Sequence, residues 1–156
     1  MNTYELSIRD MQESDAPEIY RWRNDQITIK YSKSGRGVEL EEHFNWFKNF
    51  NSSNEHLAKI AVINEKPIGI IIFTKINVIN LFEISINISP EFRKRGFGKK
   101  FLFLSEIDLT KKVGECTLRA LVLAKNKSSI SFFEKCKYKL TQKNYDTLIY
   151  EKNLAQ

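Results

Sequence analysis

The chain has 156 residues, which is room for one domain with a single hydrophobic core. Hydrophobic residues make up 42% of it and charged residues 28%, which excludes a disordered, collagen-like or disulfide-stapled protein. The sequence has no membrane-length apolar run, no secretory signal and no CxxC pair, so we expect a cytoplasmic protein. Its net charge of +6 fits either an anionic partner or a lysine-covered surface.

The first third of the chain predicts one strand and two helices. Alternating residues predict a strand over 4–9, and Ser14 is the expected N-cap of a first helix with Pro17 in its first turn. The stretch 27–38 lacks a clear period and is rich in Ser and Gly, so it predicts a loop. A second helix is expected over 39–50. Its apolar residues fall on one face, namely Leu40, Phe44, Phe47 and Phe50.

Strands dominate the rest of the chain. Three β-branched runs predict an antiparallel meander, over 57–63, 68–76 and 79–88, and Pro90 ends the third run. The remaining elements are a helix over 98–112 with Gly114 as its C-cap, a strand over 117–123, a helix over 128–137, and strands over 138–142 and 145–150. No repeat or linker interrupts them, so we expect residues 1–156 to form one domain. The predicted fold is mixed α/β, a mostly antiparallel sheet of six to seven strands with about four helices on its two faces.

A basic, glycine-containing loop stands between the third strand of the meander and the helix that follows it. Residues 93–100 hold five cations around Gly96 and Gly98. The backbone N–H groups of residues 95–99 would face one point at a helix N-terminus, where the helix dipole favours negative charge. The glycines permit a tight turn and a close approach of the backbone to a ligand. This pattern predicts a phosphate-binding loop, and the alternative is a basic turn that only starts a helix.

The sequence lacks the residues that several other types of site require. A Walker A motif would need glycine at Arg93, and a dinucleotide fingerprint would need glycine at Phe101. The two histidines, His43 and His56, belong to no cluster with metal-ligand spacing, so we expect no metal. No GxSxG elbow supports a serine hydrolase.

Two segments carry a family resemblance. Arg93-Lys94-Arg95-Gly96-Phe97-Gly98 resembles the R/Q-x-x-G-x-G/A signature of the GNAT superfamily of acyl-CoA N-acyltransferases. Residues 126–135 resemble the segment of that family that borders CoA, and the predicted order of elements matches the GNAT fold. The resemblance implies acetyl-CoA as co-substrate, its diphosphate on the loop and its pantetheine in a gap beside strand 79–88. The cofactor-binding residues it implies are Ile86, Ile88, Arg93, Lys94, Arg95, Gly96, Phe97, Gly98, Lys99, Asn126, Ser129 and Phe133.

Two further stretches are similar to bacterial amino-sugar acetyltransferases of the pseudaminic acid pathway type. They are Trp22-Arg23-Asn24-Asp25 and the Glu-Glu-His-Phe-Asn-Trp-Phe run over 41–47. The similarity implies an acceptor with a 4-amino group on a nucleotide-linked sugar. The substrate-binding residues it implies are Trp22, Arg23, Asn24, His43 and Trp46. The alternatives are that the tryptophans belong to the core, that Asn24 is a C-cap and that His43 caps local backbone.

Amine acetylation requires a proton acceptor. Glu83 interrupts an apolar strand close to where several GNAT enzymes carry a catalytic glutamate, although an exposed glutamate paired with a lysine would look the same. His43 is the rival base, because histidine titrates near neutrality. Phe133 stands where many members have a tyrosine that protonates the departing thiolate, which leaves Tyr138 or a water as substitutes. Lys137 replaces the usual glycine of the family.

The sequence therefore predicts an N-acetyltransferase that moves acetyl from acetyl-CoA to a primary amine in a ternary complex. An alternative acceptor is the N-terminus of a ribosomal-type protein. An alternative of another class is a non-catalytic CoA- or RNA-binding module, but the chain has no RNP-like aromatic run, so nucleic acid is not the expected partner. The sequence leaves open whether the chain forms a homodimer.

Overall fold

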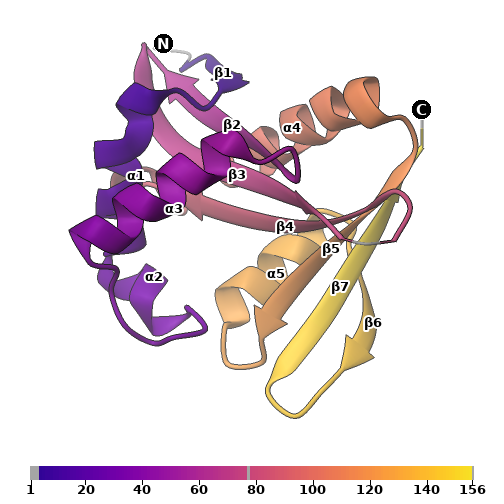
Figure 1. Cartoon of the computed structure of the whole chain (residues 1–156). Helices are drawn as coiled ribbons and strands as arrows, with labels where there is room; N and C mark the ends of the chain where they lie inside the picture. Colours follow the sequence, from indigo (N-terminus) through magenta and orange to yellow (C-terminus); the bar gives the residue numbers. More distant parts are fainter. Residues whose placement is uncertain (1–3, 77, 156) are drawn as a thin grey trace.

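The computed structural model describes residues 4–76 and 78–155, and it consists of one twisted sheet with helices on both faces (Figure 1). The seven strands lie in the order β1-β2-β3-β4-β5-β7-β6. Their bounds are β1 Leu6–Asp10, β2 His56–Ile63, β3 Lys66–Lys75, β4 Leu81–Ile88, β5 Cys116–Leu123, β6 Lys139–Lys143 and β7 Thr147–Leu154. The helices are η1 Glu13–Asp15, α1 Ala16–Arg23, α2 Gln26–Lys30, α3 Leu40–Ser52, η2 Pro90–Phe92, α4 Phe97–Val113 and α5 Lys127–Lys135.

The two central strands of the sheet separate. Every other pair of neighbours is antiparallel, but β4 and β5 are parallel and pair only through Leu81–Glu83 and Thr117–Arg119. Beyond these residues β4 continues to Ile88 and β5 to Leu123 without pairing, and Figure 1 shows the two strands diverging. The fold therefore contains the gap beside the third meander strand that the family resemblance implies.

Each face of the sheet has its own hydrophobic core. On one face α4 and α5 pack on the alternating apolar residues of the strands, including Phe82 and Ile84 of β4. On the other face α1 and α3 pack over β2 and β3 through Trp22, Phe47 and Ile60, all of which are buried. Because side chains alternate along a strand, Glu83 lies on this second face.

Two N-terminal elements differ from the prediction. Ser14 is not an N-cap, because it lies inside the short helix η1, and Asp15 directly precedes α1. Asp15 is buried and accepts two bonds of 2.8 Å from Arg9, which fixes the chain at this point. Within the predicted loop the structure has the short helix α2, which begins because the carboxylate of Asp25 accepts a bond from the N–H of Thr28.

The buried face of α3 also differs from the prediction. Phe47 and Phe50 are buried as expected, but Leu40 and Phe44 are 51% and 54% exposed. His43 takes the buried place, because its ring finds polar partners inside the chain. The antiparallel meander and the C-cap at Gly114 are as predicted.

Candidate active site

The basic glycine loop forms the start of α4. Gly96 precedes the helix with φ +82°, a left-handed conformation that favours glycine, and a Cβ built there meets nothing within 4 Å. Within the part of the chain that the structure describes, the N–H groups of Gly96, Phe97, Gly98 and Lys99 bond no side chain and no backbone outside the helix. Free N–H groups at a helix N-terminus suit an anion such as a phosphate.

The loop lies at the open end of the β4–β5 gap. A Cβ at Gly98 would lie 3.2 Å from the ring of Phe132 in α5 and 3.8 Å from the side chain of Ile88 at the end of β4. The start of α4, the end of β4 and the middle of α5 therefore meet at one place, which only glycine at 98 allows without a shift. An elongated ligand with a phosphate at one end can reach from this loop into the gap.

The Arg93 side chain positions the loop through hydrogen bonds to other segments of the chain. Its guanidinium donates to Oδ2 of Asp25 at 2.6 Å and to Oδ1 of Asn87 at 3.2 Å, and its Nε donates to the carbonyl of Ile88 at 2.8 Å. These bonds leave the Arg93 side chain little freedom to reach a phosphate. The cations beside it, Lys94, Arg95 and Lys99, are exposed and remain available for that role.

The other predicted cofactor residues lie on β4 and on α5 with its cap. The side chains of Ile86 and Ile88 pack against the α4–α5 core, so only their backbone groups face the gap. Asn126 caps α5, since its side chain accepts from the N–H of Ser129 and donates to the Ser129 hydroxyl. Phe133 is buried, with its ring 5.1 Å from that of Tyr138. The structure therefore engages the side chains of these residues in packing and capping.

Tyr138 does not fit the role of a replacement proton donor. Its hydroxyl is buried and donates to the carboxylate of Glu106 at 2.9 Å. Burial and the Glu106 charge raise the pKa of Tyr138 far above its ordinary value. A phenol in this environment gives up its proton reluctantly. Next to it, Lys137 has φ +71°, a left-handed conformation that favours glycine, although a lysine occupies the position.

Glu83 lies at the closed end of the gap. It is the last residue of β4 that pairs with β5, where it stands opposite Arg119, and on its other side it pairs with Thr74 of β3. Its side chain is half-buried on the α1–α3 face of the sheet. Arg119 bonds Glu151 at 2.8 Å, and Glu83 forms no ion pair with any residue that the structure describes. Its carboxylate is thus available to a ligand.

His43 is not placed to act as a base, which corrects that prediction. It has no exposed surface, its Nε2 donates to the carbonyl of Ala16 at 2.8 Å, and its Nδ1 accepts from Nη1 of Arg23 at 3.1 Å. Burial lowers the pKa of His43 and outweighs the bond to Ala16, which raises it, and the Arg23 charge adds to the lowering. The ring is therefore neutral, both of its nitrogens already have hydrogen-bond partners, and a substrate cannot reach it.

The remaining predicted substrate residues hold α1 against α3. Trp22 is fully buried, which corrects the expectation that it binds a substrate and agrees with the alternative of a core residue. The amide of Asn24 bonds the carbonyl of Tyr20 and both backbone groups of Val38, so it acts as a cap. The Arg23 guanidinium lies 4.6 Å from the centre of the Trp46 ring. Of these side chains, Trp46 keeps surface that lines a cavity.

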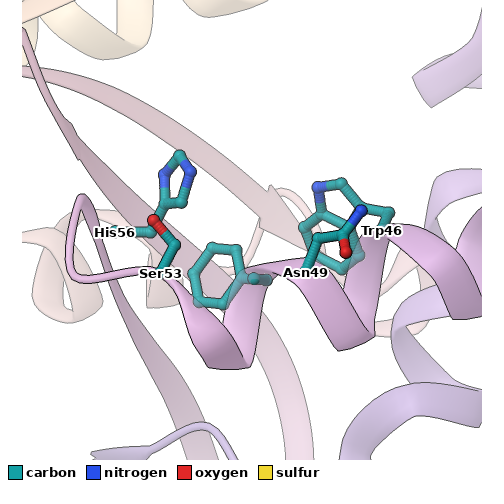
Figure 2. A pocket seen from close by; sticks show the side chains of 5 residues that line it. Trp46, Asn49, Ser53 and His56 are labelled. Carbon is teal, nitrogen blue, oxygen red and sulfur yellow. The ribbon is translucent and has the colours of Figure 1, made fainter.

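This cavity has a volume of about 290 Å³ and lies along the last turns of α3 (Figure 2). Its lining residues are Trp46, Asn49, Phe50, Ser53 and His56. Apart from Trp46, sequence reasoning missed them. The spacing of three to four residues between Trp46, Asn49 and Ser53 is a signal that places them on one side of a helix.

One family model matches most of the chain. A family model described as an acetyltransferase (GNAT) domain matches residues 5–139. A comparison with curated proteins finds no match. Among residues 4–76 and 78–155, no helix is long and apolar enough to cross a membrane, and no three His, Cys, Asp or Glu side chains cluster to hold a metal ion.

Solved structures share the fold. A domain from Methanocaldococcus jannaschii is 24% identical, with a TM-score of 0.84 over 97% of this chain and 99% of that one. Spermidine N-acetyltransferase from Vibrio cholerae, solved with CoA and spermine, is 15% identical, with a TM-score of 0.83 over 95% of each chain. The N-acetyltransferase PseH from Campylobacter jejuni is 15% identical, with a TM-score of 0.73 over 96% of this chain and 99% of that one. At these identities the likeness establishes the fold.

Proposed function

The chain belongs to the GNAT acetyltransferase family, and from this premise we propose how its site works and what it acts on. It transfers an acetyl group from acetyl-CoA to the primary amine of a small molecule. The acceptor that we propose is an amino sugar linked to a nucleotide. The observation that carries the proposal is the position of Glu83, at one end of the β4–β5 gap that has the free N–H groups of the α4 N-terminus at its other end.

The residues around the gap fit acetyl-CoA. The N–H groups of Gly96 to Lys99 bind the diphosphate, and the exposed Lys94 and Arg95 add attraction for it. Past Glu83, the backbone groups of β4 that face β5 have no strand partner among the described residues. Apart from the Ile88 carbonyl, which accepts from Arg93, they are free to bond the pantetheine amides and the thioester carbonyl. An N–H aimed at that oxygen lowers the barrier by about 3 kcal/mol. When bound, acetyl-CoA supplies the activated acetyl group.

Glu83 removes a proton from the acceptor amine. The amine reaches Glu83 from the α1–α3 face of the sheet, where the carboxylate is half-buried and forms no ion pair with a described residue. Neither Phe133 nor Tyr138 supplies a proton to the departing thiolate, because Phe133 has no acidic proton and the Tyr138 hydroxyl is buried against Glu106. A thiol has an ordinary pKa of about 8.5, so it leaves as the thiolate without one.

The proposal of an amino sugar rests on two likenesses. The stretches around Trp22 and His43 resemble amino-sugar acetyltransferases, and the fold is similar to that of PseH. The net charge of +6 argues against a polycation such as spermidine as the acceptor.

Thiol release from acetyl-CoA by the purified chain tests the proposal. The panel contains nucleotide-linked amino sugars, free amino sugars, spermidine and peptides with a free N-terminus. We expect release with the amino sugars. Release with the peptides alone indicates the N-terminal alternative, and binding of acetyl-CoA without release by any amine indicates a non-catalytic module.

A further inference from the structure

We propose that the cavity along α3 is a second acceptor subsite, which holds an uncharged ring of the acceptor away from the reacting amine. The inference rests on the proposed transfer to an amine beside Glu83 and adds where the rest of the acceptor binds. The cavity measures about 290 Å³ and is walled by Trp46, Phe50 and His56. Figure 2 shows Trp46, Asn49 and Ser53 along α3, with His56 beyond its end.

The strand register connects the cavity to Glu83. His56 of β2 pairs with Thr74 of β3, and Thr74 pairs with Glu83 of β4. Residues paired across strands point to the same face of the sheet, so His56 and Glu83 share the face on which α3 lies. Neighbouring strands are about 4.8 Å apart, which places the two residues roughly 10 Å from each other. One acceptor molecule can therefore reach both.

The walls of the cavity are fixed in place. Nδ1 of His56 and Oγ1 of Thr74 are hydrogen-bonded at 3.0 Å, and the His56 ring stacks on Phe50 with 4.9 Å between centroids. Trp46 is held by Arg23 and by the ring of His43, whose centroid lies 5.7 Å away. Aromatic walls that do not have to be ordered on binding lose little entropy, which favours affinity.

The chemistry of the lining indicates an uncharged ring with hydrogen-bonding edges. Asn49 and Ser53 offer an amide and a hydroxyl beside the aromatic rings, and none of the described residues that line the cavity is Lys, Arg, Asp or Glu. The C-terminal end of a helix carries a partial negative charge, so the end of α3 disfavours a phosphate here. A sugar ring or a nucleobase has the required flat apolar face and polar edge, whereas a linear polyamine has neither.

It follows that the acceptor carries a second ring about 10 Å from its reacting amine. A single amino sugar occupies only the part of the site near Glu83. A disaccharide or a nucleotide-linked sugar also fills the α3 cavity. The two differ in whether the second ring is a sugar or a base.

A blocking substitution tests the subsite. Asn49→Trp fills the cavity from an exposed position on α3, and Asn51→Trp, on the opposite side of the same helix, is its matched control. Acceptors are glucosamine, with one ring, chitobiose, with a second sugar ring, and UDP-glucosamine, with a base. In Asn49→Trp we expect the KM of the preferred two-ring acceptor to rise at least about tenfold, which corresponds to 1.4 kcal/mol. The KM values of glucosamine and acetyl-CoA stay unchanged, and Asn51→Trp changes none of them.

The outcomes separate the two proposals. If the chain transfers acetyl but Asn49→Trp leaves the KM of the two-ring acceptor unchanged, the subsite is overturned. An equal rise in the KM of glucosamine overturns it too. Acceptance of glucosamine but of neither two-ring compound overturns it as well. Absence of transfer to every amine overturns the proposed function instead. Thermal unfolding of both tryptophan variants shows that they are folded, and Asn49→Ala, which only removes the amide, is expected to raise the two-ring KM about threefold.

Discussion

Arg93 and Asp25 are joined by a hydrogen-bonded ion pair with 2.6 Å between Nη1 and Oδ2, across 68 residues of sequence. Asp25 is the N-cap of α2, and Arg93 also bonds the carbonyl that ends β4. The pair therefore connects α2, the end of β4 and the basic loop at one point. Arg93, the first position of the family signature, is accordingly a positioning residue whose charge is already neutralised by Asp25.

Arg93→Ala is expected to lower the free energy of unfolding by about 2–3 kcal/mol, because it leaves a half-buried carboxylate without its partner. The KM of acetyl-CoA rises because the loop is no longer held. Arg95→Ala, at an exposed position, raises that KM without a loss of stability. Urea unfolding and initial rates measure both quantities. Equal stability of the two variants would contradict the positioning role.

The substrate-binding predictions show what the sequence did and did not reveal. The strand meander and the glycine loop follow local rules of β-branching and glycine placement, so they were predictable, whereas the gap was expected only from the family resemblance. Whether a tryptophan meets a substrate or a core depends on which helix packs against it. Trp22 and His43 became internal because α1 lies directly against α3, a contact that no local pattern encodes.

The face of α3 was mispredicted for a related reason. Periodicity alone assigned Phe44 to the buried side, but His43 has two partners inside the chain, Ala16 and Arg23, and takes that place. A polar side chain becomes a core residue when its hydrogen bonds are satisfied. Such partners come from distant segments, so they are visible only in the folded structure.

Substitutions at Gly96 separate ligand binding from backbone strain. Gly35 has φ +66° and Gly96 has φ +82°, and a Cβ at either position meets nothing within 4 Å. Alanine at either position should cost about 1 kcal/mol of stability, since both adopt a left-handed conformation. Only Gly96→Ala is expected to raise the KM of acetyl-CoA, by about tenfold or more, because it alone faces the proposed diphosphate. An equal effect of Gly35→Ala on that KM would contradict the role of the loop.

Glu83→Gln removes the proposed proton acceptor and keeps the shape of the side chain. We expect kcat to fall by about a hundredfold or more, the usual contribution of a positioned base. The KM of acetyl-CoA should stay constant, because the loop and the gap are unchanged. Ser85→Ala, on the same strand and the same face, is the control and should retain kcat. Full activity of Glu83→Gln in steady-state assays would assign the proton to water.

His43→Gln distinguishes a structural histidine from a catalytic one. In the folded chain burial keeps the pKa of His43 below its ordinary value of 6.5, so the unfolded chain binds its proton more readily. The stability that neutral His43 contributes is complete above pH 6.5 and is lost as the pH falls through its folded-state pKa. Because the substitution removes both hydrogen bonds of the ring, the variant should be less stable than the native chain by about 1–2 kcal/mol at pH 8. On acidification the variant should lose less stability than the native chain does. Urea midpoints from pH 8 to pH 5 measure this, and kcat at pH 8 should match that of the native chain. A hundredfold fall in kcat with native stability would instead restore His43 as the base.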